Sequence, residues 1–179
     1  MNIFFLHPNP RRCARWHCDK HVVKMIIESC QLLYTCHWML AHLFDLVEPP
    51  YIHCAPNRGY KMTHPKHPCG IWLRESLDNY RWLVKLTEEL ILEYKYRYGN
   101  KTHKCEEHLI WLKMNEPFGL CSVGFTPPNC AMPDEYKRSN PVSSYRTFYR
   151  LSKDEKRGIV KYTGRHRPHF MTEKHIDSR

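Results

Sequence analysis

Two long stretches without glycine or proline constrain the fold of this chain more than any other feature. The first covers residues 11 to about 44, and the second covers residues 71–98 and stops at a Gly-Asn pair. Apolar side chains recur in both stretches at helical spacing, and Gly-Asn is a typical helix end. The sequence therefore predicts a mainly α-helical fold that is built around two long helices.

The rest of the chain predicts loops and shorter helices inside one domain, residues 1–179. Residues 45–70 hold five prolines and two glycines, which indicates a long loop between the two helices. Asn9-Pro10 and Asn140-Pro141 predict helix starts, because asparagine caps a helix and proline fits its first position. Short helices are expected at 105–114 and 142–152. Residues 2–6 are expected to form a buried strand or an extended apolar segment, and a basic extension begins at about residue 154.

The charge of the chain indicates a polyanionic partner. Lys and Arg number 28 against 18 Asp and Glu, and residues 137–179 alone carry twelve basic and four acidic residues. Aromatic residues are interleaved with this charge, as in nucleic-acid-binding segments. The predicted nucleic-acid contacts there are Tyr145, Arg146, Arg150 and Lys153. The alternatives are a basic tail that only keeps the protein soluble, or one that joins a protein assembly.

The first long helix is predicted to carry a polar face opposite its apolar one. At 100° per residue, five polar side chains share one narrow wedge: His17, His21, Lys24, Glu28 and Gln31. One interpretation is a metal site in which His17, His21 and a carboxylate bind zinc or another divalent ion. The other is a catalytic face, with Glu28 as general base and the histidines and Lys24 holding phosphates.

The second long helix repeats this pattern. Asn79, Trp82, Glu93 and Arg97 share a face that mixes amide, aromatic and charged groups. Asn79 and Arg97 are predicted to contact a base or a phosphate, Glu93 to act as acid or base, and Trp82 to pack or to stack on a base. If the chain is an enzyme, the two polar faces are expected to meet across one pocket.

No cofactor is assigned from the sequence, although zinc or another divalent metal stays open. The Cys and His residues lack the spacing of a zinc finger, and neither a deaminase signature nor a glycine-rich phosphate loop is present. No apolar run approaches the roughly 20 residues of a membrane span, so no membrane association is predicted. Nine cysteines without a secretory signal favour free thiols in an intracellular, reducing compartment.

Four runs carry a resemblance to known proteins: HCDKHVVKMIIESCQLL (17–33), HPCGIWLRESLDNYRWL (67–83), EYKYRYG (93–99) and SYRTFYRLSK (144–153). They resemble a family of small helical proteins of phages and large DNA viruses. More distantly, the layout is similar to the pyrimidine-dimer DNA glycosylases of the phage endonuclease type. That resemblance rests on a first helix with His and Glu, a long middle helix with a basic Gly turn, and an aromatic-basic C-terminus.

The glycosylase resemblance implies that Glu28 is the catalytic carboxylate. It also implies that a freed N-terminal amine is the nucleophile. Here Met1 is followed by Asn2, which usually leaves the methionine in place. Two expectations follow: either another amine, such as that of Lys20 or Lys24, takes this role, or the chain is not a lyase.

The function predicted from the sequence is therefore nucleic-acid binding, with DNA base processing of the glycosylase or nuclease kind on a His/Lys/Glu helix face. In this hypothesis His17, Lys20 and His21 contact the nucleic acid, and Lys24 and Glu28 are catalytic. The first alternative is a non-enzymatic virion or architectural protein. The second is a metalloprotein that uses His17, His21 and a carboxylate.

Overall fold

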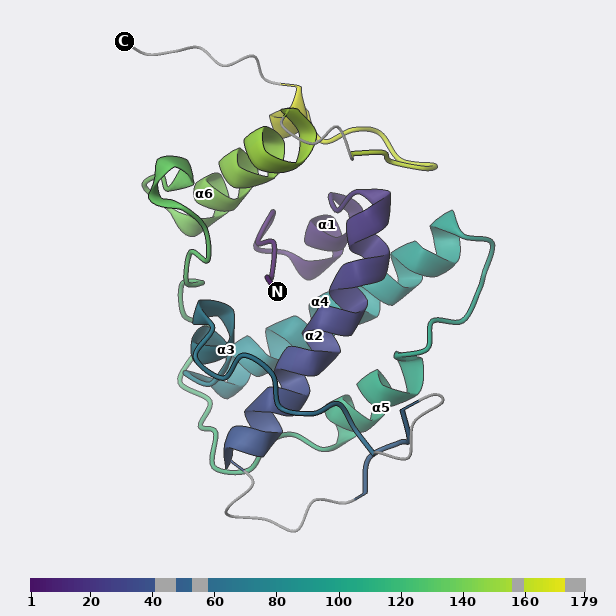
Figure 1. Ribbon diagram of the computed structural model, residues 1–179, viewed down its shortest axis with the longest axis vertical. Helices are drawn as coiled ribbons and strands as arrows, with labels where there is room; N and C mark the ends of the chain where they lie inside the picture. The colour runs from purple at the N-terminus through teal and green to yellow at the C-terminus, as the bar shows by residue number, and fades with distance from the viewer. Residues whose placement is uncertain (41–47, 53–57, 156–159, 173–179) are drawn as a thin grey trace.

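The computed structural model describes residues 1–40, 48–52, 58–155 and 160–172, and these residues form a mainly helical fold (Figure 1). Within these ranges the only β-structure is one bridge between Tyr51 and Arg58. The fold class predicted from the sequence, with two long helices α2 and α4, is confirmed. The elements are α1 (Pro10–Arg15), α2 (Asp19–Leu40), α3 (Pro68–Leu73), α4 (Leu77–Arg97), α5 (Glu106–Met114), η2 (Asp134–Tyr136), α6 (Pro141–Phe148), η3 (Tyr149–Glu155) and η4 (His169–Met171).

The first predicted helix is in fact two helices, because the chain breaks at residues 16–18. Contacts from distant residues stabilise this break. The Arg97 guanidinium donates to the carbonyls of Arg15 (3.0 Å) and His17 (2.8 Å). The Tyr149 hydroxyl accepts from the Cys18 amide (2.8 Å). These bonds satisfy backbone groups that a continuous helix would otherwise pair. The predicted end near residue 44 lies outside the described residues.

The second predicted helix is also divided, and the predicted start at residue 71 is wrong. Helix α3 begins at Pro68, so the predicted loop ends before residue 70. The chain then turns at residues 74–76, and Ser76 caps α4 by accepting from the Asp78 amide (3.1 Å). Serine favours this cap because its hydroxyl replaces a missing intrahelical partner. The end of α4 at Arg97 agrees with the predicted stop.

The predicted helix starts and short helices are confirmed. Asn9 and Asn140 cap α1 and α6, each followed by proline at the first helical position. The expected short helix at 105–114 is α5. The helix expected at 142–152 is α6, which continues into a π-helical turn at 149–155. Residues 2–6 are extended and buried but join no strand.

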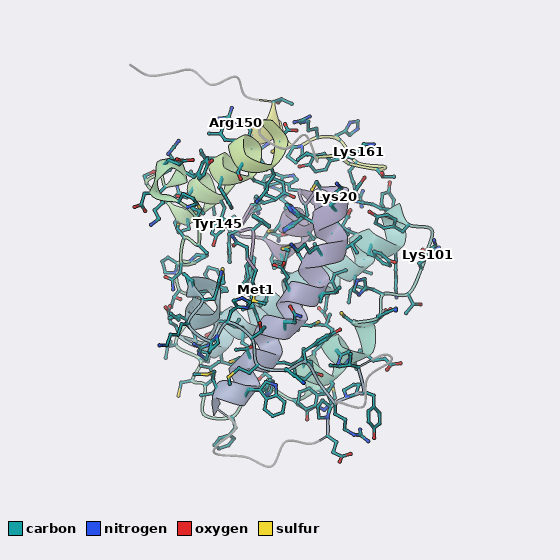
Figure 2. All side chains as sticks on the ribbon, in the orientation of Figure 1. Met1, Lys20, Lys101, Tyr145, Arg150 and Lys161 are labelled. Carbon is teal, nitrogen blue, oxygen red and sulfur yellow. The ribbon has the colours of Figure 1, made fainter. Side chains whose placement is uncertain are left out.

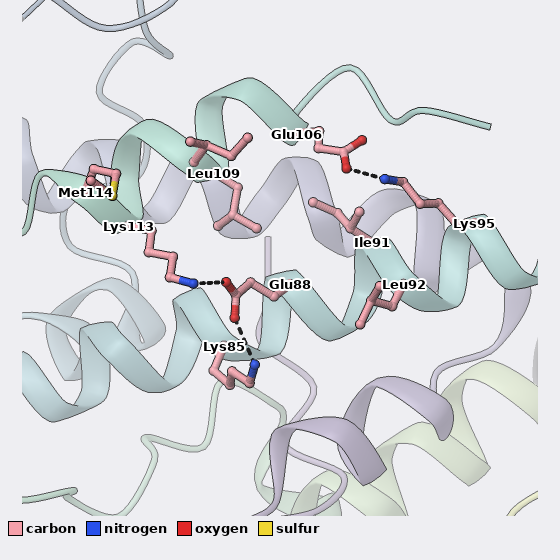
Figure 3. Close-up of a pocket in the computed structure, with 10 residues that line it drawn as sticks. Lys85, Glu88, Ile91, Leu92, Lys95, Glu106, Leu109, Lys113 and Met114 are labelled. Atoms are coloured by element: carbon pink, nitrogen blue, oxygen red, sulfur yellow. Dashed lines mark hydrogen bonds and ion pairs between the residues drawn. The ribbon is translucent and has the colours of Figure 1, made fainter. Parts of the chain in front are cut away.

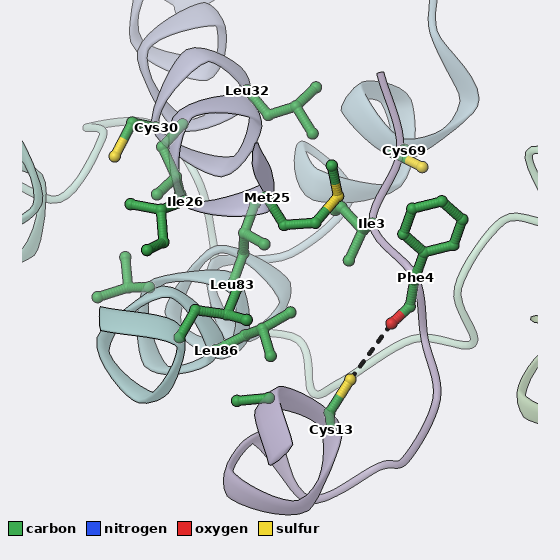
Figure 4. Close-up of a cluster of buried hydrophobic side chains, with 14 of the residues drawn as sticks. Ile3, Phe4, Cys13, Met25, Ile26, Cys30, Leu32, Cys69, Leu83 and Leu86 are labelled. Carbon is green, nitrogen blue, oxygen red and sulfur yellow. Dashed lines mark hydrogen bonds between the residues drawn. The ribbon is translucent and has the colours of Figure 1, made fainter. Parts of the chain in front are cut away.

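The core forms where α1 and α2 pack across α4 (Figure 1). Met25 and Ile26 of α2 meet Leu83 and Leu86 of α4, and Ile3 of the N-terminal segment lies beside them (Figure 4). Each such side chain contributes roughly 1.5–3 kcal/mol when it leaves water. The N-terminal segment is thus fixed in the core, which determines where the end of the chain lies.

The described C-terminal residues, from α6 onward, pack against this N-terminal segment (Figure 1). Arg146 of α6 donates from Nε to the Leu6 carbonyl (2.9 Å). Tyr149 contacts the link before α2 through Cys18 and contacts α2 through His21. None of the described helices is long and apolar enough to cross a membrane.

Candidate active site

The N-terminus of the chain lies against the middle of α2, beside Glu28. This carboxylate is buried, with 8% of the residue exposed. Its Oε2 accepts from the Asn2 amide (2.9 Å) and lies 3.9 Å from the α-amine of Met1. Its Oε1 lies 3.3 Å from Nζ of Lys24, one helical turn earlier. Figure 2 shows Met1 beside α2 in the middle of the molecule.

The Asn2 side chain is held from two further directions. Its Nδ2 donates to the Ala131 carbonyl (3.0 Å), and its Oδ1 accepts from the Cys69 thiol (3.6 Å). The 129–131 loop is itself fixed by the Tyr145 hydroxyl, which donates to the Asn129 carbonyl (2.8 Å) and accepts from the Ala131 amide (3.2 Å). Residues from α2, α3, the 129–131 loop and α6 therefore fix the position of the chain end.

His67 lies beside the N-terminus. Its Nδ1 accepts from the Cys69 amide (3.2 Å), which caps α3. Burial lowers the pKa of His67, the nearby α-amine and His64 lower it further, and the Met1 backbone acts in the opposite direction and raises it. A neutral ring with Nδ1 as acceptor leaves Nε2–H free to donate.

The two histidines of the predicted polar face are buried and neutral at pH 7. His21, on α2, lies 2.7 Å from the Tyr149 hydroxyl and stacks on Phe4. Its pKa is lowered to about 3 by burial, then by His17, Lys153 and Lys24. His17 lies in the link between α1 and α2, and burial lowers its pKa to about 4. Neither ring therefore offers a positive charge to a phosphate at neutral pH.

The predicted metal site receives no third ligand in the described part of the chain. No group of three or more His, Cys, Asp or Glu residues there is arranged to hold an ion. His17 uses Nδ1 for the Cys13 carbonyl (2.7 Å), while its buried Nε2 has no partner. A zinc or other divalent ion on His17 and His21 stays a prediction.

Glu93 lies in a different environment, a buried arginine network. The residue is 4% exposed and accepts from Arg97 Nε (3.1 Å), Arg165 Nε (3.0 Å) and Arg165 Nη2 (2.6 Å). Arg15 Nε lies 3.7 Å away. Arg97 also bonds Asp19 at the start of α2 (3.0 Å), roughly 13 Å along the helix from Glu28. The structure therefore does not bring the two predicted carboxylates into one cluster.

Asn79 and Trp82 of α4 make contacts inside the protein. Asn79 Nδ2 donates to the Trp72 carbonyl (2.8 Å) and to the Thr126 hydroxyl (2.7 Å). Trp82 stacks on Phe5 with ring centroids 3.9 Å apart. These contacts join α4 to α3, to the loop around Thr126 and to the N-terminal segment. The predicted contacts of Asn79 and Trp82 with a base stay predictions.

The predicted basic contacts lie in two places. Lys20 and Lys24 are exposed on α2, and of the two Lys24 pairs with Glu28. Of the C-terminal residues, Arg146 bonds the Leu6 carbonyl and lies 4.9 Å from the Trp16 ring centroid, and Lys153 Nζ lies 4.8 Å from that of Phe148. Tyr145 is buried, and Arg150 is half-buried at the start of η3.

Sequence reasoning missed Asn2 and His67 as parts of this cluster, and it set the N-terminal amine aside in favour of Lys20 or Lys24 because Met1 stays in place. A main-chain amine has no side-chain motif, so no pattern marks Met1. His67 followed by proline was a readable signal for a helix cap, because the proline fits the first helical position. Only the packing of the N-terminal segment on α2 places these groups beside Glu28.

A groove lies between α4 and α5, away from the Glu28 cluster. It encloses about 490 Å³ and includes Ile91, Leu92 and Leu109 in its lining. Ion pairs cross it, between Lys113 and Glu88 (2.7 Å) and between Lys95 and Glu106 (Figure 3). No candidate catalytic residue lines this groove.

Comparison with known proteins identifies a family. Residues 1–107 match the family model described as pyrimidine dimer DNA glycosylase. No curated protein and no solved structure matches the chain. The matched residues include the Glu28 cluster from Met1 to His67, but not Tyr145 and the 129–131 loop that complete it.

Proposed function

Because this chain belongs to the pyrimidine dimer DNA glycosylase family, we propose that it removes dimerised pyrimidines from duplex DNA with its N-terminal amine and Glu28. The single observation that carries this proposal is the position of Glu28. A buried carboxylate lies 3.9 Å from an α-amine. An amine is a nucleophile when it has lost its proton, and an adjacent carboxylate can accept that proton.

The reaction uses these two groups in sequence. The amine nitrogen attacks C1′ of the damaged nucleotide, the C1′–N1 bond breaks, and its electron pair leaves with the base, which takes a proton from water. Glu28 accepts a proton from the attacking nitrogen and returns it to O4′ as the sugar ring opens, which leaves an iminium at C1′. Loss of a C2′ proton then expels the 3′ phosphate, and water hydrolyses the imine and frees the amine.

The charge distribution supports duplex DNA as the substrate. Lys20 and Lys24 are exposed on α2, Lys24 beside Glu28, and the chain carries a net charge of +10. Phosphate contacts of this kind position a duplex and weaken as salt rises. A glycosylase must extrude its target nucleotide from the stack, and a dimerised base is extruded at lower cost than a paired one.

The test is a reaction of the full chain with a duplex that contains one ultraviolet-induced pyrimidine dimer. The same duplex without damage is the control, and borohydride is added to reduce the imine to a stable adduct. We expect strand cleavage and a covalent protein–DNA adduct with the damaged duplex alone. Absence of base release, cleavage and adduct with the damaged duplex would contradict the proposed function.

A further inference from the structure

The groove between α4 and α5, with its volume of about 490 Å³, exposes several large apolar side chains (Figure 3). Ile91 and Leu109 are buried in its floor. Around them Leu92 is 58% exposed, Ile110 60% and Met114 77%. Single exposed apolar residues are common on protein surfaces, whereas a group of them in one groove is typical of a contact site. The groove therefore has the composition of a protein–protein interface.

Two ion pairs show that α4 and α5 run in opposite directions along the groove. Lys113 bonds Glu88 (2.7 Å), and Lys95 is paired with Glu106 (Figure 3). The two pairs are separated by about two helical turns on each helix, and the apolar floor lies between them. At one end of the groove the glutamate belongs to α4 and the lysine to α5, and at the other end the assignment is reversed.

This arrangement of charges is complementary to itself. A two-fold axis along the groove would place α4 of one copy over α5 of a second copy, and the two facing helices would be antiparallel. Glu88 of one copy would then face Lys113 of the other, and Lys95 would face Glu106. Four charges would alternate in sign at each end, while the exposed apolar side chains would meet in the middle.

The net charge of the groove also suits a second copy better than a nucleic acid. The whole chain carries +10, whereas the lining of the groove has three lysines and two glutamates. Copies of a strongly basic protein repel each other, and contact through a nearly neutral face keeps this repulsion small. Among the described residues that line the groove, none contacts Glu28, so the candidate active site stays open.

We propose that the α4/α5 groove is the interface of a dimer, in which two copies of this chain pack α4 against α5 about a two-fold axis along the groove. This inference goes beyond the proposed function and does not depend on it. Leu92 and Ile110 of each copy fill the centre, where removal of apolar surface from water drives association. The alternating charges at the two ends determine how the copies align.

The first experiment is sedimentation equilibrium of the full chain without DNA, over a series of protein concentrations. We expect a reversible monomer–dimer equilibrium. Ile110→Glu places a charge in the centre of the contact and should weaken dimerisation at least about tenfold. Val123→Glu is the matched control, because Val123 is 67% exposed outside the groove, and it should dimerise like the wild type. Circular dichroism verifies that both variants are folded.

Two results of this experiment would overturn the inference. A wild type that stays monomeric up to about 1 mM would leave the groove to a different partner. Dimerisation of folded Ile110→Glu with the affinity of the wild type would place the contact on another surface.

A pair of charge variants tests the two-fold arrangement itself. Glu88→Lys combined with Glu106→Lys makes both ends of the groove positive, and Lys95→Glu combined with Lys113→Glu makes both ends negative. Each protein should be monomeric alone, because like charges would face each other, and an equimolar mixture should form a heterodimer. Wild-type dimerisation by either folded variant alone, or no association in the mixture of folded variants, would contradict the arrangement.

Discussion

Glu28 and Glu93 are both buried glutamates on the long helices, yet their surroundings differ in one decisive respect. Glu28 faces a main-chain amide and two amines, whereas Glu93 faces the guanidinium groups of Arg15, Arg97 and Arg165. An amine can lose a proton and act as a nucleophile, while a guanidinium stays protonated and cannot. The kind of cation beside a buried carboxylate, more than its burial, therefore separates a reactive cluster from a structural one.

The Glu93 cluster joins parts of the chain that are distant in sequence. Arg15 ends α1, Arg97 ends α4, and Arg165 belongs to the C-terminal region. Arg97 also bonds the backbone at the break between α1 and α2. The comparison thus predicts that substitution of Glu93 mainly lowers the free energy of unfolding, while substitution of Glu28 mainly lowers the rate of base release.

The largest expected effect on stability is that of Glu93→Gln. The substitution removes the carboxylate that Arg15, Arg97 and Arg165 share. Buried Arg97 keeps its pair with Asp19, so the cost is at most that of a broken buried ion pair, about 3–5 kcal/mol. Urea denaturation measures the free energy of unfolding. Glu28→Gln is the matched control and should lose about 1 kcal/mol, since a glutamine oxygen still accepts from the Asn2 amide. A larger loss of stability for Glu28→Gln than for Glu93→Gln would contradict this prediction.

A smaller effect is expected when the pH falls, because His17 must stay neutral to remain buried. Its pKa is lowered from 6.5 to about 4 by burial, followed by the charge of Arg97. Between these values the unfolded chain binds more protons than the folded one, so stability falls as pH decreases through this window. The titration of His17 should lower the free energy of unfolding by about 2 kcal/mol between pH 7 and pH 5.

The measurement is urea denaturation at several pH values for the wild type and for His17→Gln. The free energy of unfolding of the wild type should fall more steeply with decreasing pH than that of His17→Gln, because the variant lacks the titration of His17. Identical slopes for the two proteins would show that His17 does not titrate on unfolding in this range.

Tyr145→Phe tests whether α6 supports the position of Asn2 beside Glu28. The lost hydroxyl bonds both Asn129 and Ala131, and its removal should cost about 1 kcal/mol of stability. Release of the loop that holds Asn2 should also slow base release roughly tenfold. Tyr96→Phe is the control, since its hydroxyl bonds Gly164 on an exposed part of the surface. Equal rates of base release for the two variants would contradict a role of Tyr145 in positioning Asn2.

The smallest expected effect is that of Lys24→Gln on DNA binding. If Lys24 contacts a phosphate, its loss should lower the slope of log affinity against log salt by about 1. Stability should change by under about 0.5 kcal/mol, because the Lys24–Glu28 pair is exposed at its lysine end. Lys113→Gln, in the α4/α5 groove, is the control and should leave the salt slope unchanged.

Local signals in the sequence predicted much of the fold, and contacts between distant residues explain the errors. The Asn-Pro caps and the end of α4 follow from neighbouring residues. The break after α1 depends on Arg97 and Tyr149, which no local pattern relates to residues 16–18. A helical projection across that break placed His17 on the Glu28 face, although it lies in the link.

In the candidate site, too, local sequence patterns indicated some residues, while others depend on contacts between distant parts of the chain. The spacing of polar residues and the family resemblance both indicated Glu28. The spacing also made Glu93 a candidate acid or base, because its partner Arg165 lies 72 residues further along the chain. The role of Met1 depends on where the N-terminal segment packs, and this information is tertiary. The sequence therefore predicted which carboxylates were candidates, and the structure shows that their surroundings differ.

The most direct test of this distinction is the single-turnover rate of base release from a dimer-containing duplex by Glu28→Gln and Glu93→Gln, at a temperature where both are folded. General acid–base catalysis contributes about 10²–10⁴-fold. We predict that Glu28→Gln loses at least about 100-fold in rate, while folded Glu93→Gln stays within about tenfold of the wild type. A full rate for Glu28→Gln, or a larger loss for Glu93→Gln, would contradict the assignment of the active site to Glu28 and the N-terminal amine.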